Sequence, residues 1–198
     1  MSKRIIFLGS SVTYGSAAGG VSFADIICEK NGYEMIKEAV SGTTLVDSEE
    51  LSYISRLRKI NCDSADLLIC QLSTNDASLG KPIGSISDSR EMKDFDTTTV
   101  AGAIEYILAY VTDKWHCPMT FYTGTKYDSE EYSKMVFLLN EIAKKWNISL
   151  IDLWNEPSFN SVSKEEYSKY MNDPIHPTLL GYKEWWSPYI EKCIVEMI

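Results

Sequence analysis

The sequence contains few histidines and no closely spaced pair of cysteines. Only His116 and His176 occur among the 198 residues, and the five cysteines form no Cys-x-x-Cys pair and no metal-like spacing with either histidine. Zinc sites and disulfide frameworks need such clusters. The sequence therefore predicts no metal site and reduced thiols that pack in the core or at its edge.

Long hydrophobic runs are also missing. The chain starts MSKRIIFLGSS, and this apolar run ends at Gly9. A signal-peptide core or a membrane span needs a longer run. We therefore expect a protein without a membrane span that is located in the cytoplasm.

Positive charge is in short supply. Lys and Arg total 19 against 28 Asp and Glu, which gives a formal net charge of -9. Such a surface repels phosphate backbones and anionic lipid headgroups, so we expect no nucleic-acid partner. The content of hydrophobic (44%) and charged (24%) residues is ordinary for a globular protein. This length and composition predict one domain over residues 1–198, and they make no prediction of oligomeric state.

Apolar strand-like runs alternate with helical patterns along the whole chain. The predicted strands are residues 4–9, 33–40, 66–72, 118–123 and 148–153, and the predicted helices include 22–30, 100–111, 135–146 and 178–196. Alternating strands and helices indicate parallel βαβ units. The predicted fold class is α/β, a single-domain three-layer α/β/α sandwich of flavodoxin-like type with a five-stranded parallel sheet in the order 2-1-3-4-5.

Ligands of open α/β sheets bind at the carboxyl ends of the strands, so the residues after each strand matter most. Ser11 follows the first strand within Gly9-Ser10-Ser11-Val12-Thr13. A serine on a strand-to-helix turn can act as a nucleophile, although it can equally cap the helix. Thr13 stands where a G-x-S-x-G elbow has its second glycine, and no phosphate-loop lysine follows.

A second polar segment, Asn172-Asp173-Pro174-Ile175-His176-Pro177, lies near the other end of the chain. The two prolines stiffen the turn, and Asp173 can bind one imidazole nitrogen of His176 while the other nitrogen accepts a proton. Capping of the last helix is the alternative role of His176, and a metal site there lacks further ligands.

Two other residues compete for these roles. Asp152 ends the fifth predicted strand and is an alternative to Asp173 as the acid, although a turn or helix cap also explains it. His116 lies in a polar segment at a helix end, where a surface or C-cap position explains it better than chemistry does.

Two further turns contain hydrogen-bond donors. Ser73-Thr74-Asn75-Asp76 follows the third strand, and Ser41-Gly42-Thr43-Thr44 follows the second. The Asn75 amide and the Gly42 N–H are both suitable donors to an oxyanion, and glycine lets a ligand approach the backbone closely. Each segment alone is also compatible with a simple turn.

Together these four segments resemble the blocks of the SGNH, or GDSL-type, hydrolase family. FLGSSVTYG resembles the first block, in which the serine is the nucleophile, and this position is Ser11. SGTT and STND resemble the second and third blocks and place the oxyanion donors at Gly42 and Asn75. DPIHPTLLGY resembles the last block, D-x-x-H-P, and gives Asp173 and His176. The resemblance spans residues 9 to 176.

The resemblance implies a serine esterase that needs no metal or organic cofactor. His176 would take the proton of Ser11 and Asp173 would orient the imidazole. The amides of Ser11 and Gly42 and the Asn75 side chain would hold the oxyanion. The expected substrates are small-molecule esters with small acyl groups, with acetyl esters of sugars as the first expectation.

Two positions depart from the family pattern. Ser10 replaces the aspartate of G-D-S and changes the hydrogen bonding of the nucleophile turn. Ser73 replaces the glycine of G-x-N-D and is expected close to the acyl group. We predict Tyr14 and Ser73 as substrate contacts. The polar segment 80–99 is interpreted either as a substrate wall or lid or as a surface insertion without function.

Two other functions remain open from the sequence. A flavodoxin-like module could bind a flavin phosphate in the hydroxyl-rich turn Ser10–Ser16, although this leaves the Asp173–His176 turn unexplained. An SGNH-fold domain could also have lost its activity through the changes at Ser10 and Ser73.

Overall fold

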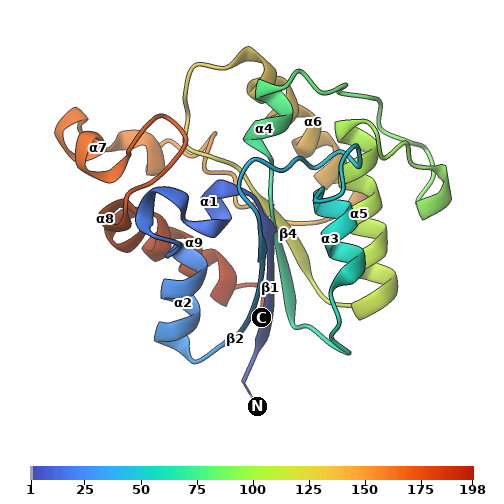
Figure 1. Cartoon of the computed structure of the whole chain (residues 1–198), viewed down its shortest axis with the longest axis horizontal. Coiled ribbons are helices and arrows are strands. Elements are labelled where there is room, and N and C mark those ends of the chain that lie inside the picture. Colours follow the sequence, from blue (N-terminus) through green and yellow to red (C-terminus); the bar gives the residue numbers. More distant parts are fainter. Residues whose placement is uncertain (1) are drawn as a thin grey trace.

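A four-stranded parallel sheet forms the centre of the computed structural model, which describes residues 2–198. The strands lie in the order β2-β1-β3-β4. Their bounds are Arg4–Gly9 (β1), Glu34–Ala39 (β2), Leu67–Gln71 (β3) and Met119–Tyr122 (β4). All carboxyl ends point to the same edge, at the top of Figure 1, where α1 and α4 begin. The predicted α/β class is confirmed.

The central strand β1 determines how both faces of the sheet are covered. It pairs in parallel with β2 and β3, with Ile6 opposite Ile36 and Leu68. Its side chains alternate between two separate apolar clusters, with Ile5 in one and Ile6 in the other. Because both faces are apolar, helices must cover each of them.

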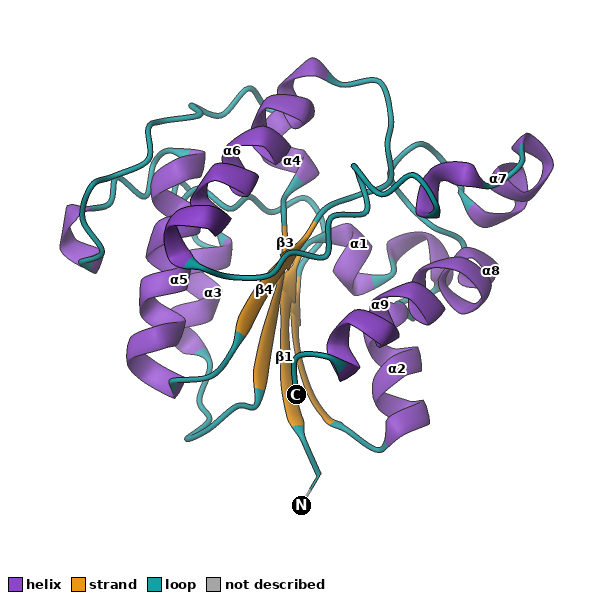
Figure 2. Ribbon diagram, turned by 180° about the vertical axis from the view of Figure 1, so that it is seen from behind, coloured by secondary structure: helices purple, strands orange, loops and turns teal. Residues whose placement is uncertain are grey.

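Helices pack on both faces and complete the three layers (Figure 2). One face is covered by α2 (Phe23–Asn31) and by a C-terminal helix made of α8 (Leu179–Gly181), the π-helical turn η4 (Tyr182–Trp186) and α9 (Ser187–Val195). The other is covered by α3 (Tyr53–Lys59), α5 (Val100–Trp115) and α6 (Glu130–Trp146).

Six short helical segments lie between these elements. They are α1 (Ser11–Tyr14), η1 (Ser16–Ala18), α4 (Thr74–Ser78), η2 (Met92–Asp94), η3 (Phe159–Ser161) and α7 (Lys164–Tyr170). Apart from the helix start after the first strand, the sequence pattern did not predict them, because segments this short have no hydrophobic period to read. The longer predicted helices 22–30, 100–111, 135–146 and 178–196 are present.

The fifth predicted strand, 148–153, is reduced to a single bridge between Ile151 and Tyr122. Ile151 N–H donates to Phe121 O at 2.9 Å, and Thr123 N–H donates to Ile151 O at 3.1 Å. On one side of this bridge the Thr120 hydroxyl binds Ser149 O at 2.9 Å, outside the backbone ladder. On the other side the chain turns tightly. The sheet therefore has four strands instead of five, although residue 151 occupies the predicted fifth position.

No helix within residues 2–198 combines the length and the apolar character that crossing a membrane requires. The five cysteines are free thiols, of which Cys28 and Cys70 are buried in the core.

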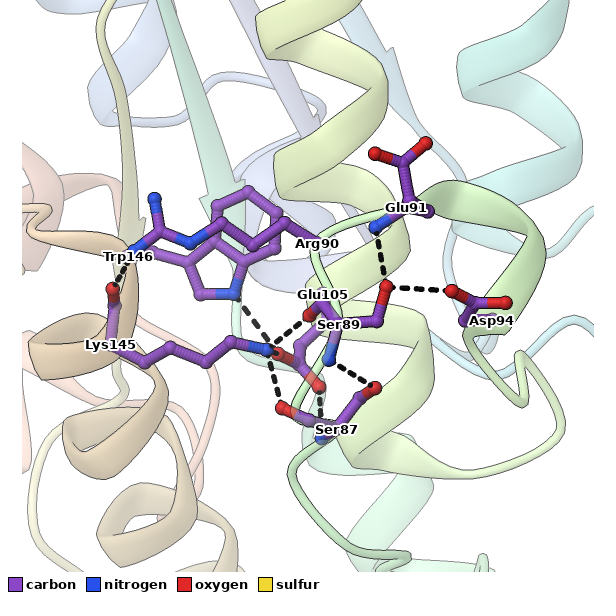
Figure 3. A network of polar contacts seen from close by, with 8 residues as sticks. All are labelled: Ser87, Ser89, Arg90, Glu91, Asp94, Glu105, Lys145 and Trp146. Atoms are coloured by element: carbon purple, nitrogen blue, oxygen red, sulfur yellow. Dashed lines mark hydrogen bonds and ion pairs between the residues drawn. The ribbon is translucent and has the colours of Figure 1, made fainter.

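A buried ion pair fixes the middle of segment 80–99 (Figure 3). The fully buried Glu105 of α5 pairs with Lys145 of α6 and accepts hydrogen bonds from Trp146 Nε1 (3.0 Å) and Ser87 N–H (2.8 Å). Lys145 also donates to the carbonyls of Ser87 and Ser89, at 2.6 Å each. Segment 80–99 was predicted to be either a substrate wall or lid or a surface insertion without function. The contacts that hold it against α5 and α6 favour the surface insertion.

The buried pair makes a prediction about stability. Lys145→Met should lower the free energy of unfolding by about 3 kcal/mol, because it leaves the Glu105 carboxylate buried without its counter-ion. Urea unfolding followed by circular dichroism measures this. Lys144→Met is the matched control, because the Lys144 side chain is 72% exposed and pairs only at the surface with Glu141. Equal effects of the two substitutions would contradict the prediction.

Candidate active site

Ser11 is the first residue of α1, directly above the end of β1. The turn needs Gly9, because a Cβ on that residue would lie 1.8 Å from Thr13 Oγ1. Gly15 ends the short helix in the left-handed conformation, with φ of 87°, and its N–H donates to Ser11 O. The local sequence therefore folds into one tight turn that holds Ser11 at the carboxyl edge of the sheet. Its exposed fraction is only 7%.

Gln71, the last residue of β3, holds this turn from below. Its Oε1 accepts hydrogen bonds from Ser10 N–H (3.0 Å), Thr13 N–H (3.2 Å), the Thr13 hydroxyl (2.9 Å) and the Tyr122 hydroxyl (3.1 Å). Sequence reasoning missed this residue. The available signal was its rarity, because Gln71 is the only glutamine in the chain and interrupts the apolar run of β3.

His176 meets Ser11 from the other end of the sequence. Ser11 Oγ lies 2.8 Å from His176 Nε2, and His176 Nδ1 lies 2.8 Å from Asp173 Oδ2. The turn that carries the pair is closed by a bridge between Met171 and Pro177 and by a 2.9 Å hydrogen bond from Asn172 N–H to His176 O. The three side chains predicted from the sequence are therefore joined in one continuous hydrogen-bonded chain.

Asp173 is held in the ionised form. Partial burial alone would raise the pKa of its carboxyl group. The N–H of Ile175 (2.8 Å), the N–H of His176 (2.9 Å) and the His176 ring outweigh burial and lower the pKa below the ordinary value. A carboxylate fixed in this way can orient an imidazole and stabilise its protonated form.

The two predicted donor turns lie side by side. Gly42 is exposed and has a φ of 84°, which favours glycine. Asn75 Nδ2 donates to the carbonyl of Thr43, the next residue, at 2.8 Å. An amide nitrogen carries two hydrogens, so this bond orients the Asn75 amide and leaves one hydrogen for a ligand.

Asp76 connects these two turns and is a second residue whose part the sequence did not reveal. Its fully buried carboxylate accepts hydrogen bonds from the N–H groups of Leu45 (2.7 Å) and Val46 (3.2 Å). Burial raises the pKa of this carboxyl group, and the hydrogen bonds from Ser73 and from the two N–H groups counteract the rise. The pattern STND indicated Asn75 but not that its neighbour fastens segment 43–46.

Ser10 and Ser73, the departures from the family pattern, are both fully buried. Within residues 2–198 the Ser10 hydroxyl has no hydrogen-bond partner. Ser73 Oγ accepts a hydrogen bond from Asp76 N–H at 3.4 Å and lies 3.5 Å from Thr43 O, so it caps α4. Tyr14 is 44% exposed, with the Lys37 ammonium 5.7 Å from its ring centroid. Substrate contacts of Tyr14 and Ser73 stay predictions.

Asp152 and His116, which the sequence offered as alternatives to Asp173 and His176, occupy other positions in the structure. Asp152 accepts hydrogen bonds from the Thr123 hydroxyl (3.1 Å), Asn155 Nδ2 (2.7 Å) and Asn140 Nδ2 (3.2 Å), which is the turn role considered from the sequence. His116 is the C-cap of α5 in the left-handed conformation, as expected, with a φ of 51°.

A small cavity of about 10 Å³ lies next to the nucleophile turn, with Val12 in its lining. Four of its lining residues are sequence neighbours of the residues above, since Val12 follows Ser11, Thr74 precedes Asn75, and Pro174 and Ile175 lie between Asp173 and His176. The rest of the lining comes from the ends of β3 and β4 and from nearby residues of the segment that leads into α6: Gln71, Leu72, Tyr122, Gly124, Thr125, Tyr127 and Tyr132. A space of this size holds roughly one water molecule.

No group of three or more His, Cys, Asp and Glu side chains within residues 2–198 is arranged to hold a metal ion. At this edge of the sheet, a hydroxyl lies within hydrogen-bond distance of an imidazole, with amide groups nearby, an arrangement that can carry out acyl transfer.

Solved structures share this fold. A protein from Lactobacillus plantarum is 18% identical with a TM-score of 0.81, and the alignment covers 100% of this chain and 99% of that one. An inhibitor-bound aryl esterase from M. smegmatis is 14% identical with a TM-score of 0.67 and complete coverage of both chains. A family two carbohydrate esterase from Clostridium thermocellum, in complex with cellohexaose, is 14% identical with a TM-score of 0.65, covering 98% of this chain and 65% of that one.

No curated protein sequence matches the chain. The family model of the GDSL-like lipases and acylhydrolases matches residues 7–184, a range that contains all the residues of the site from Ser11 to His176. Because this match spans most of the sequence and the fold agrees with it, the chain belongs to the GDSL-like lipase/acylhydrolase family and is a hydrolase.

Proposed function

We propose that this hydrolase is a serine esterase in which Ser11 is the nucleophile, His176 the general base and Asp173 the residue that orients it. The observation that carries the proposal is the hydrogen-bonded chain from Ser11 Oγ through His176 to the ionised Asp173. Few structural roles require a hydroxyl, an imidazole and a carboxylate to be joined in this order at one sheet edge.

In the proposed reaction His176 Nε2 takes the proton from Ser11 as the hydroxyl oxygen attacks the ester carbonyl carbon. The alcohol leaves with the proton that His176 returns to it, and an acyl-enzyme remains. Water then attacks the acyl carbon with His176 again as base, which releases the acid and restores Ser11. Asp173 stays ionised throughout and stabilises the imidazolium. No step calls for a metal or an organic cofactor.

The negative charge on the carbonyl oxygen would be held by the N–H groups of Ser11 and Gly42 and by the Asn75 amide. Thr43 O supports this role because it fixes the orientation of the Asn75 amide next to Gly42. Losing one donor of this type typically costs about a hundred- to a thousand-fold in rate.

The proposed substrates are esters of small acyl groups, acetyl first, with carbohydrates as candidate alcohols. The cavity next to the nucleophile turn supports the acyl assignment, because its volume of about 10 Å³ leaves no room for a long acyl chain. The carbohydrate part rests on the resemblance in fold to a carbohydrate esterase. A cytoplasmic location stays a prediction from the sequence.

Family membership disfavours the flavin-binding alternative, whereas a domain that has lost its activity remains the competing hypothesis. The unpartnered hydroxyl of Ser10 is the observation on which it depends. Neither Ser10 nor Ser73 interrupts the chain of hydrogen bonds from Ser11 to Asp173, which favours the active enzyme.

Removal of the nucleophile or the base tests the proposal. Ser11→Ala and His176→Ala should each lower kcat for p-nitrophenyl acetate on the order of 10⁴-fold or more, because the remaining groups cannot replace either one. A fluorophosphonate probe should label the native protein and not Ser11→Ala. Ser16→Ala, an exposed hydroxyl on the same turn, is the control and should keep both activities. A native protein without hydrolysis or labelling would establish the inactive alternative.

The proposal that Asp173 rather than Asp152 is the acid can be tested separately. Asp173→Asn should lower kcat about 10⁴-fold, because an amide favours the wrong imidazole tautomer and cannot stabilise its charge. Asp152→Asn is the matched control, since the Asp152 carboxylate bonds Thr123, Asn140 and Asn155 instead of His176. Steady-state kinetics of both folded variants measure kcat and distinguish the two assignments. A larger loss in Asp152→Asn would reverse the assignment.

The size of the cavity predicts the acyl preference. With p-nitrophenol as the constant leaving group, kcat/KM should fall about tenfold or more from acetate to butyrate, because overpacking typically costs about 1–3 kcal/mol. Ile175→Ala should narrow this difference by enlarging the cavity. Leu180→Ala, an exposed apolar residue outside the cavity, is the control and should leave the ratio unchanged. A native preference for butyrate or hexanoate would exclude the acetyl assignment.

A further inference from the structure

Arg56 is a buried cation beneath the proposed active site. It lies on α3, and only 4% of it is exposed. The helix α3 itself packs on the same face of the sheet as α5 (Figure 1). Within residues 2–198 no carboxylate forms an ion pair with it. The Tyr53 ring, one helical turn earlier, packs against the guanidinium, whose central carbon lies 5.2 Å from the ring centroid. The charge is therefore enclosed by the protein rather than neutralised.

Each donor group of Arg56 instead binds a neutral acceptor. Nη2 donates to Gly9 O at 2.8 Å and to the Thr43 hydroxyl at 3.1 Å. Nη1 donates to Glu38 O, and Nε donates to Leu51 O at 3.0 Å. One planar guanidinium therefore joins the end of β1, the end of β2 and the turn after β2. A planar fork with five N–H groups can do this, whereas a single ammonium cannot.

Two of the residues that accept hydrogen bonds from Arg56, Gly9 and Thr43, lie close in sequence to the proposed oxyanion donors or bind them directly. Gly9 is two residues before Ser11, whose N–H is the first donor. Thr43 follows Gly42, whose N–H is the second. Thr43 O holds the Asn75 amide, which is the third. The relative position of the three donors therefore depends on the two strand ends and the one turn that Arg56 connects.

The energetic cost of Arg56 supports a functional reason for it. Burial lowers the pKa of the guanidinium, which is the sign of a charge that the interior disfavours. Removing the charge would avoid that cost but leave the four acceptors without a donor. Arg56 therefore ties the two strand ends and the turn together through hydrogen bonds that an apolar side chain cannot make.

We propose that Arg56 is the positioning residue of the oxyanion hole, an inference that rests on the proposed esterase function. The oxyanion forms only in the transition state, so misplaced donors should lower kcat and leave KM nearly unchanged. Arg56 does not touch the triad, so the pH at which kcat/KM reaches half its maximum should stay where it is in the native enzyme.

The experiment compares Arg56→Met and Arg56→Lys with the native chain on p-nitrophenyl acetate. We expect kcat to fall about a hundredfold in Arg56→Met, as displacements near 1 Å typically cause, and less in Arg56→Lys. The rate at which a fluorophosphonate labels Ser11 should fall in parallel, because that reaction passes through a similar oxyanion. Arg58→Met is the matched control: Arg58 lies on the same helix but is bound to Asp47 and Tyr106 at the surface, and its loss should change neither rate.

Thermal unfolding identifies variants that are not folded at the assay temperature. If Arg56→Met is one of them, Thr43→Val replaces it, because it removes the hydroxyl that Arg56 binds, and Thr43→Ser should restore the lost kcat. A folded Arg56→Met with kcat within about twofold of native overturns the inference, as does a Thr43→Val enzyme equal to Thr43→Ser. A loss confined to KM also overturns it. A native chain without esterase activity or labelling refutes the proposed function itself, and this inference with it.

Discussion

Parallel pairing of β1 with β2 and β3 is the constraint on which the rest of the site depends. Because all three strands run in one direction, the residues after each of them reach the same edge of the sheet. Ser11, Gly42 and Asn75 are separated by more than thirty residues at each step of the sequence, and this pairing makes them neighbours. The Asp173–His176 turn does not follow a strand of the sheet. Hydrogen bonds from the N–H groups of Ile175 and His176 to Asp173 hold its shape, and His176 contacts Ser11.

Beneath that edge, three buried polar side chains hold the turns in place. Gln71 binds the nucleophile turn, Asp76 binds segment 43–46, and Arg56 binds the ends of two strands. Each is costly to bury, and each is satisfied by backbone groups that an ordinary turn would leave to water. The apolar core on either side supplies stability, and this polar layer supplies the precision that the proposed chemistry needs.

The sequence predicted the fold class and the strand order up to β4, because hydrophobic period is a local signal. Its short motifs also indicated Ser11, Asp173 and His176, whose side chains are joined by hydrogen bonds in the structure, while their catalytic roles stay predictions. It could not predict Gln71 or Arg56 as members of the site. Their roles exist only through partners far away in the chain, such as Thr13 with Gln71 and Gly9 with Arg56. The fifth strand was wrongly extended because the apolar run 148–153 does not reveal the tight turn after Ile151.

Ser73 illustrates how a departure from a family pattern is better judged by contacts than by position. Ser73 lies two residues before Asn75 and was predicted to lie close to the acyl group. Its hydroxyl caps α4 and faces Thr43 O, and Ser73 does not line the cavity next to the nucleophile turn. These contacts give Ser73 a part in supporting Asn75, while its contact with a substrate stays a prediction. Val12, Thr74, Pro174 and Ile175, which line the cavity, are sequence neighbours of Ser11, Asn75, Asp173 and His176, so the turns that carry the proposed catalytic groups also border the space proposed for the acyl group.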